Sequence, residues 1–498
     1  MGIISRYVRE QKRYTKNEIK DNFEFDNDRE LELFIGNLKS YGIIKTVKAD
    51  HNQKDLSYLM DEDLIIVDEA IENGECFYVF AYVGIITIGQ RIIKVLPKYM
   101  TKYDDNNHSE NELLEDMRMV IKVLEEYNYS TEQLVKLINS KEENTRFNQL
   151  SIMLFLLKDY YENGLYSNEE TINEVNGIGQ VIWDKTINEN IAVVKDNKPY
   201  YIETITSKNK KNEYDYFQKL HKYVLTDCSK QLEEAGVSEL FDVESIELSN
   251  ETIDYFGDTD FICYKLNGEL SQQFNTRKQV LLKTLLTYIS HSKHSLFNNY
   301  GVSMFGTTAF NRIWEEACRQ VFGNKLDYSL KSLNLDKGTF KQSEEKTLSE
   351  IIEKPKWKVG NYKEREISGT LTPDLVCVEK INKTDYFVIL DAKYYLLEIS
   401  ESGEVRGNPG ISDLTKQYLY QLAFEELIKQ NQISVKENCF LLPSEDDKIK
   451  KGYASLEMLN GVGLEVIQYR IIPANIVFNK YLSKKRIPLK WLQLDSKL

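Results

Sequence analysis

The sequence lacks the short motifs that mark several familiar enzyme classes. It contains no GxxxxGK[ST] phosphate loop, no GxGxxG after an expected strand and no HExxH. The chain therefore has no P-loop of its own for a nucleotide. The signatures of a dinucleotide-binding fold and of a zinc peptidase are missing too, and no internal repeat is evident.

Long hydrophobic runs and paired cysteines are missing as well. No apolar run approaches the roughly 20 residues that span a membrane. The N-terminal segment MGIISRYVREQKRY has no apolar signal core, and Arg6 breaks the myristoylation pattern. None of the six cysteines stands in a CxxC or Cys/His zinc spacing. We therefore expect a reduced, cytoplasmic protein that is not attached to a membrane.

The chain has fewer basic than acidic residues: 64 Lys and Arg against 78 Asp and Glu, which gives a net charge of −14. This balance argues against a protein held on DNA mainly by a global positive field. Two local stretches are basic, residues 207–222 and 479–491, and the second contains no acid. Runs of this kind are common on solvated surfaces, so they do not by themselves indicate a ligand.

The 498 residues allow roughly two to four domains. Residues 15–48 predict two helices, in a pattern compatible with a winged helix. From Asp63 to residue 98 the sequence is β-rich, with Gly89-Gln90 as the expected turn. Further helices are expected over residues 110–140, 145–163, 214–234 and 275–291. Strands are expected between the second and third of these helices, and residues 250–267 and 331–346 are weakly patterned.

Two apolar runs, LVCV and YFVIL, are separated by the polar EKINKTD and predict a β-hairpin. With the turn centred on Asn382-Lys383, Asp374 lies opposite Asp391, and strand periodicity places Lys393 on the same face as Asp391. Opposed carboxylates repel each other unless a cation holds them.

Mg²⁺ suits such a pair, because it takes oxygen ligands and fills its other positions with water and substrate phosphate. A neighbouring lysine orients a water or stabilises a phosphate. Asp374 and Asp391 are therefore expected metal ligands, and Lys393 an expected catalytic residue, of a phosphodiester hydrolase. The alternative is an ordinary ion pair at a surface strand end.

The PD at 373–374 and the DAK at 391–393 resemble the core motif of PD-(D/E)xK nucleases. That resemblance implies a helix on either side of the hairpin, here 307–322 and 413–430. It implies an auxiliary acid on the first helix, for which Glu315 is preferred over Glu316. On the second helix it implies Gln417 as a support residue near metal and phosphate, and Asp413 is expected to cap that helix.

The run WEEACRQVF…PKW…TLTPDLV…VILDAKYY…KQYLYQ resembles the LlaJI family of restriction endonuclease subunits, and GIITIGQRIIKVLPK at 84–98 resembles McrC-type proteins. The resemblance implies an endodeoxyribonuclease subunit of a GTP-dependent restriction system, with DNA and a McrB-like AAA+ GTPase ring as partners. The missing P-loop fits a motor located on another chain.

We accordingly expect a multidomain α/β protein. Residues 1–105 form an N-terminal α+β domain that docks the ring, residues 106–304 a middle helical and β region, and residues 305–498 a PD-(D/E)xK domain with a mixed central sheet flanked by helices. Two alternatives remain. One is a repair or recombination nuclease without a GTPase partner, and the other is an adaptor that activates the ring without cutting.

Overall fold

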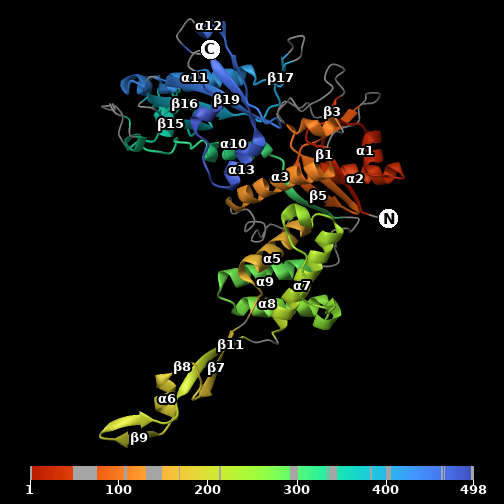
Figure 1. Cartoon of the computed structure of the whole chain (residues 1–498), viewed down its shortest axis with the longest axis vertical. Coiled ribbons are helices and arrows are strands. Elements are labelled where there is room, and N and C mark those ends of the chain that lie inside the picture. The colour runs from red at the N-terminus through yellow and green to blue at the C-terminus, as the bar shows by residue number, and fades with distance from the viewer. Residues whose placement is uncertain are drawn as a thin grey trace. The chain divides into compact units, whose positions relative to one another are not determined.

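The computed structural model describes residues 3–48, 76–105, 109–130, 148–167, 169–211, 215–291, 301–333, 335, 345–381, 384–399, 405–433, 435–460, 464 and 466–494. The chain forms two compact units. Unit 1 comprises Met1–Leu134 and Met304–Leu498, and unit 2 comprises Val135–Ser303. The protein is of the mixed α/β class, as expected (Figure 1). Within the described ranges, no helix is both long and apolar enough to cross a membrane.

The first sheet of unit 1 has the strand order β1-β6-β5-β12. Its strands are β1 (Ile4–Arg9), β5 (Val83–Ile88), β6 (Arg91–Leu96) and β12 (Val302–Thr307). β5 and β6 pair antiparallel around the expected turn, where Gly89 has φ +56°. β5 and β12 approach so closely that a Cβ on Gly84 would lie 2.2 Å from the Phe305 carbonyl oxygen. Only glycine fits there.

The two expected N-terminal helices are confirmed as α1 (Lys16–Asn22) and α2 (Asp28–Ser40). Thr15 caps α1 in a capping box with Glu18, and Asn27 caps α2. A small sheet of order β2-β4-β3 accompanies them. Its strands are β2 (Arg13–Tyr14), β3 (Ile44–Lys48) and β4 (Cys76–Phe80).

The second large sheet of unit 1 has the strand order β15-β16-β19-β21-β20. Its strands are β15 (Leu375–Ile381), β16 (Thr384–Ala392), β19 (Val435–Ser444), β20 (Lys450–Ala454) and β21 (Ile467–Pro473). β15 and β16 form the expected antiparallel hairpin, whereas β16, β19 and β21 run parallel to one another. The sheet is therefore mixed.

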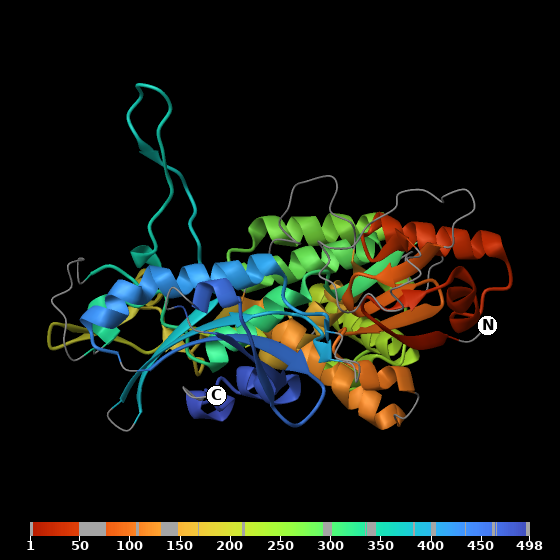
Figure 2. The same ribbon diagram turned by 90° about the horizontal axis from the view of Figure 1, so that it is seen from above.

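Helices cover both faces of this sheet. Phe387 and Ile389 of β16 pack with Phe424 of α11 (Ile411–Gln430) in one apolar cluster. On the other face lie α10 (Phe310–Val321), whose buried Trp314 donates a hydrogen bond to the Leu441 carbonyl, and α13 (Ala474–Leu482). Figure 2 shows α11 along one side of the blue strands and α13 on the opposite side.

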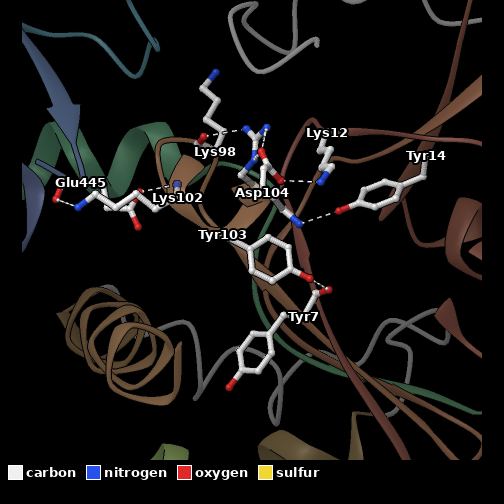
Figure 3. Close-up of polar contacts among 9 residues, drawn as sticks. Tyr7, Lys12, Tyr14, Lys98, Lys102, Tyr103, Asp104 and Glu445 are labelled. Atoms are coloured by element: carbon white, nitrogen blue, oxygen red, sulfur yellow. Dashed lines mark hydrogen bonds and ion pairs between the residues drawn. The ribbon is translucent and has the colours of Figure 1, made fainter. Parts of the chain in front are cut away.

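The two sheets of unit 1 are joined through α3 and the loop after β6. α3 (Glu110–Ser130) packs on β5 and β6 as well as on α10 and α13. Lys102 donates its backbone N–H to the Glu445 carboxylate at 2.8 Å, as drawn in Figure 3. Residues 1–105 and 305–498, expected as two separate domains with a middle region between them, thus largely share one compact unit. Contacts between residues hundreds of positions apart leave no local pattern in a sequence.

The core of the other unit is helical. Its helices are α5 (Gln149–Asn163), α6 (Trp183–Glu189), α7 (Tyr216–Glu234), α8 (Thr259–Gln272) and α9 (Thr276–Ser290). A bidentate ion pair between Arg277 and Asp159 ties α9 to α5. α8 falls where the sequence is weakly patterned, because it buries only Ile262 and Leu266. The expected continuation of helices through residues 131–147 lies outside the described residues.

The strands of unit 2 form two further small sheets, of order β7-β11-β8 and β10-β9. Their bounds are β7 (Glu169–Val175), β8 (Gln180–Val181), β9 (Ala192–Lys195), β10 (Lys198–Tyr201) and β11 (Ile205–Lys211). Two short hairpins of unit 1 are the remaining strands in the described part of the chain. They are β13 (Lys356–Trp357) with β14 (Arg365–Glu366) and β17 (Glu398–Ile399) with β18 (Val405–Arg406).

Candidate active site

Asp374 and Asp391 meet across the hairpin of β15 and β16. Leu375 pairs with Leu390, so the register places Asp374 opposite Asp391, as the sequence predicts. The Ala392 N–H donates a 2.8 Å hydrogen bond to Oδ2 of Asp374, which fixes this carboxylate against the partner strand. Two acidic side chains thus share one end of a rigid sheet.

Burial sets the electrostatics of this pair. Asp391 is 4% exposed and Asp374 is half-buried. The pKa of Asp374 is raised to about 8, mainly because burial removes the carboxyl group from water and secondly because the Asp391 carboxylate is nearby. A buried carboxyl group whose pKa is raised by a second carboxylate next to it forms a site that favours a bound cation.

Lys393 follows on the same face and supplies part of the positive charge. Its Nζ lies 2.8 Å from Oδ2 of Asp391 and 3.4 Å from Oδ1 of Asp413. Its backbone N–H donates to the Leu441 carbonyl at 2.9 Å, which extends the pairing with β19. Burial lowers the pKa of Lys393, but the Asp391 carboxylate outweighs burial and the net pKa is raised. The side chain is therefore a cation at neutral pH.

Asp413 also belongs to this cluster, although its sequence context indicates only a helix cap. α11 begins two residues earlier than expected, so the N-cap is Gly410 and Asp413 is the third helical residue. Its Oδ2 accepts the Gly410 N–H at 3.2 Å and the Tyr395 hydroxyl at 3.4 Å. Its Oδ1 faces Lys393. A carboxylate early in a helix gives no sequence signal for such a second contact.

The two adjacent acids of α10 point in different directions. Glu315 is half-buried, and burial raises the pKa of its carboxyl group. The charge of Lys393 lowers this pKa and the charge of Asp391 raises it, and the net pKa is raised. Glu316 instead accepts a 2.8 Å hydrogen bond from Gln320 on the outer surface of the helix. Of the two acids, Glu315 is the one whose pKa is affected by the charges of Lys393 and Asp391. Trp314 is fully buried, as expected for a core residue.

α11 contributes two further polar side chains close to the hairpin. The hydroxyl of Tyr420 donates to the carbonyl of Thr372 at 2.9 Å and so holds the loop that leads into Asp374. Gln417 is fully buried, and its backbone carbonyl accepts from Asn438. Within the described residues, neither end of the Gln417 amide has a hydrogen-bond partner. Its expected support role stays a prediction.

The donor set fits a magnesium ion. Oδ1 of Asp374 and Oδ1 of Asp391 are the carboxylate oxygens not used in the hydrogen bond from Ala392 and the ion pair with Lys393. In the described part of the chain, no three His, Cys, Asp or Glu side chains gather closely enough to hold a metal by themselves. Mg²⁺ accepts this arrangement, because it commonly binds one or two carboxylates and completes its octahedron with waters and substrate phosphate.

The arrangement provides adjacent anionic and cationic groups on one rigid surface. The carboxylates can hold a divalent cation, and the Lys393 ammonium group is fixed beside it by Asp391 and Asp413. Such a set of groups can orient a water and stabilise developing negative charge on a phosphate oxygen.

Comparisons with known proteins identify the family of the chain. The chain is 30% identical over 418 residues to the type II restriction enzyme BsuMI component YdjA of Bacillus subtilis, an alignment that covers 83% of both chains. Residues 82–468, more than half of the chain, match the LlaJI restriction endonuclease family.

Two solved structures from Thermococcus gammatolerans also align with the chain. One is a refined half-complex from a tetradecameric assembly of McrB AAA+ hexamers with bound McrC, at 14% identity and a TM-score of 0.37, covering 96% of this chain and 99% of that chain. The other is a cryo-EM structure of the McrBC complex, at 11% identity and a TM-score of 0.23, covering 62% and 84%. By its extended family match and its curated relative, the chain belongs to the LlaJI restriction endonuclease family.

Proposed function

We propose that the chain is the nuclease subunit of a restriction system and that it hydrolyses DNA phosphodiester bonds with Mg²⁺. The observation that carries this proposal is the placement of Asp374 opposite Asp391, with Lys393 ion-paired to Asp391 at 2.8 Å. Membership of a restriction endonuclease family supports DNA as the substrate.

The surrounding fold supports a PD-(D/E)xK nuclease domain. An antiparallel hairpin carries the two motifs and continues into parallel strands, and α10 and α11 cover opposite faces of the sheet. Asp374 precedes the first strand of the hairpin and Asp391 lies near the end of the second. Such placement at strand ends lets both carboxylates reach a substrate beyond the sheet.

The acidic and basic residues of the site have different proposed roles. Asp374 and Asp391 would hold Mg²⁺, which when bound polarises the scissile phosphate and lowers the pKa of a coordinated water. Lys393 has a raised pKa, so it acts here as a fixed cation that orients the attacking water and stabilises the phosphate. Glu315 serves as an auxiliary acid that faces Asp391 and Lys393.

A separate AAA+ GTPase of the McrB type would supply the motor. The chain lacks a P-loop, and its net charge of −14 leaves much of the DNA affinity to another subunit. Residues 1–105 are the proposed docking region. There, α1 and α2 lie between β2 and β3, and the sheet order β2-β4-β3 is compatible with a winged helix.

A cytoplasmic location accompanies this proposal, because DNA restriction takes place there. Five cysteines of the described residues are free thiols, which a reducing compartment preserves. Cys228, Cys318, Cys377 and Cys439 are buried in the core.

The test of the proposed function is DNA cleavage by the purified chain, with Mg²⁺ or EDTA, and with or without a McrB-like GTPase from the same organism. We expect cutting only with Mg²⁺, no GTP hydrolysis by the chain alone, and stimulation of cutting by the GTPase with GTP. Cutting at the same rate without the GTPase would support a stand-alone repair or recombination nuclease. GTPase stimulation without any cutting would support a non-cutting adaptor.

A further inference from the structure

An exposed hairpin rises from unit 1 directly before the first catalytic motif. It is built on β13 and β14, with Lys356 paired to Glu366 and Trp357 to Arg365. Residues 353–369 are all exposed. Figure 2 shows this teal hairpin projecting from the body of the molecule as a two-stranded arm. We refer to residues 353–370 as the hairpin arm.

The root of the hairpin arm is tied to the active site. The Thr370 hydroxyl donates to the Glu353 carbonyl at 2.7 Å and closes the base of the arm. Two residues further on, the Thr372 carbonyl accepts the Tyr420 hydroxyl at 2.9 Å, and Asp374 follows. The arm is thus anchored four residues from a proposed metal ligand.

The hairpin arm concentrates positive charge on an acidic protein. Residues 353–370 contain five cations and three carboxylates, Glu353, Glu364 and Glu366, so the arm has a net charge of +2 in a chain whose net charge is −14. The cations are Lys354, Lys356, Lys358, Lys363 and Arg365. Lys356 lies 3.9 Å from Glu366, a loose exposed pair that leaves its charge available. Charge of this sign and density attracts a polyanion.

Large apolar side chains on the arm are left in water. Trp357 is 63% exposed, Val359 67% and Tyr362 78%. The Tyr362 N–H donates to the Val359 carbonyl at 3.1 Å and forms the tip of the arm, where Gly360 has φ +51°. An aromatic side chain gains no folding energy in this position, whereas in the major groove of DNA it can contact base edges and the methyl group of thymine.

We propose that the hairpin arm binds duplex DNA and guides it to the carboxylate pair. The proposal deepens the proposed nuclease function and rests on it. A two-stranded ribbon fits the major groove of B-DNA. From its root to its tip the arm extends about 20 Å, since a strand rises about 3.3 Å per residue. Lys356 and Lys358 contact phosphates, and Trp357 and Tyr362 contact bases.

The first experiment measures affinity. Full-length protein is titrated in EDTA against a short fluorescein-labelled DNA duplex, and anisotropy is recorded at several salt concentrations. Lys356→Ala/Lys358→Ala is expected to bind about 3- to 10-fold more weakly and to lower the slope of log K against log salt by about two. Lys484→Ala/Lys485→Ala, in the basic C-terminal segment, removes the same charge and is the matched control, expected to change affinity less than about twofold.

The second experiment locates the base contacts. Trp357→Ala/Tyr362→Ala keeps all charges, so the salt slope is expected to stay unchanged while affinity falls at least about fivefold through the loss of contacts with base edges. Photocrosslinking to a duplex that contains 5-bromodeoxyuridine should label a peptide from residues 353–370. Crosslinks confined to other segments, or equal losses in the hairpin and control variants, would overturn the proposal.

The outcomes separate this proposal from the nuclease proposal. If the wild type cuts DNA and the variants of the hairpin arm bind and cut DNA as the wild type does, the arm is not the DNA-binding site and the nuclease assignment stands. If the hairpin variants lose DNA binding but the wild type never cuts, the arm stands and the nuclease assignment fails. Stronger binding of single-stranded RNA than of duplex DNA by the wild type would also contradict the arm proposal. Because the arm is fully exposed, the variants should melt at the wild-type temperature.

Discussion

The hydroxyl of Tyr394 donates a 2.6 Å hydrogen bond to the carboxylate of Glu10, a residue 384 positions earlier in the chain. The same Glu10 carboxylate accepts the backbone N–H of Lys98, whose ammonium group lies over the Tyr394 ring at 4.8 Å. Tyr394 directly follows Lys393. The N-terminal sheet region is therefore bonded to the segment that follows β16, one residue beyond Lys393.

This contact predicts a stability effect for Tyr394→Phe. The substitution leaves the buried Glu10 carboxylate short of one donor, so we expect the free energy of unfolding to fall by about 1–3 kcal/mol. Urea denaturation measures it. Tyr453→Phe, on an exposed side chain, is the control and should stay within about 0.5 kcal/mol of wild type. Equal stability of the two variants would contradict the buried contact.

Asp374→Asn tests the carboxylate pair without metal. Removing one of two mutually repelling charges should raise the melting temperature of the metal-free protein near pH 8, or at least leave it unchanged. Mg²⁺ should raise the melting temperature of the wild type, because a ligand that binds only the folded state stabilises it. The variant should gain much less. A similar gain with Mg²⁺ in both proteins would place the ion elsewhere.

Glu315→Gln and Glu316→Gln form a matched pair, since both remove one carboxylate from the same helix. Charge interactions with Lys393 and Asp391 affect the pKa of Glu315, so its loss should reduce the rate of DNA cleavage about 10- to 100-fold. Glu316 binds Gln320 at the outer surface, so its loss should change the rate less than about twofold. Reversed effects in single-turnover cleavage would reverse the assignment.

His221 predicts a pH dependence of stability in unit 2. Its Nδ1 accepts the Tyr166 N–H at 3.0 Å, and burial lowers its pKa to about 4. An unfolded chain takes up this proton near pH 6.5 while the folded chain resists it. Stability is therefore lost as pH falls from 6.5 to 4, by up to about 3 kcal/mol.

Replacement by Gln, which keeps an acceptor, should remove this contribution. The measurement is the difference in unfolding free energy between His221→Gln and wild type at pH 7 and at pH 4.5. The difference should shift in favour of the variant at the lower pH. An identical difference at both values would show that His221 is not held neutral by the fold.

The sequence predicted the hairpin register correctly because the register follows from local rules. The polar turn centred on Asn382-Lys383 and the strand period of two together place Asp374 opposite Asp391, and the observed pairing agrees. The N-terminal helices were equally predictable, since Thr15 and Asn27 are good caps.

Other features depended on contacts between distant residues. Nothing near Asp413 indicates that its carboxylate faces Lys393. The bond between Glu10 and Tyr394 joins segments expected to be separate domains. α8 was missed because a helix with two buried residues has too little apolar periodicity to recognise. The hairpin arm was missed because exposure is not visible in the sequence.

The most direct test of the central claim is Mg²⁺-dependent DNA cleavage by wild type, Lys393→Ala and Lys393→Arg, with the GTPase and GTP present. Arg keeps the charge, but its planar fork does not reproduce the point contacts of the ammonium group with Asp391 and Asp413. Both variants should therefore lose most cutting, while calorimetric Mg²⁺ binding survives. Near-normal cutting by Lys393→Ala would contradict the account, because Lys393 would then be an ordinary strand-end cation.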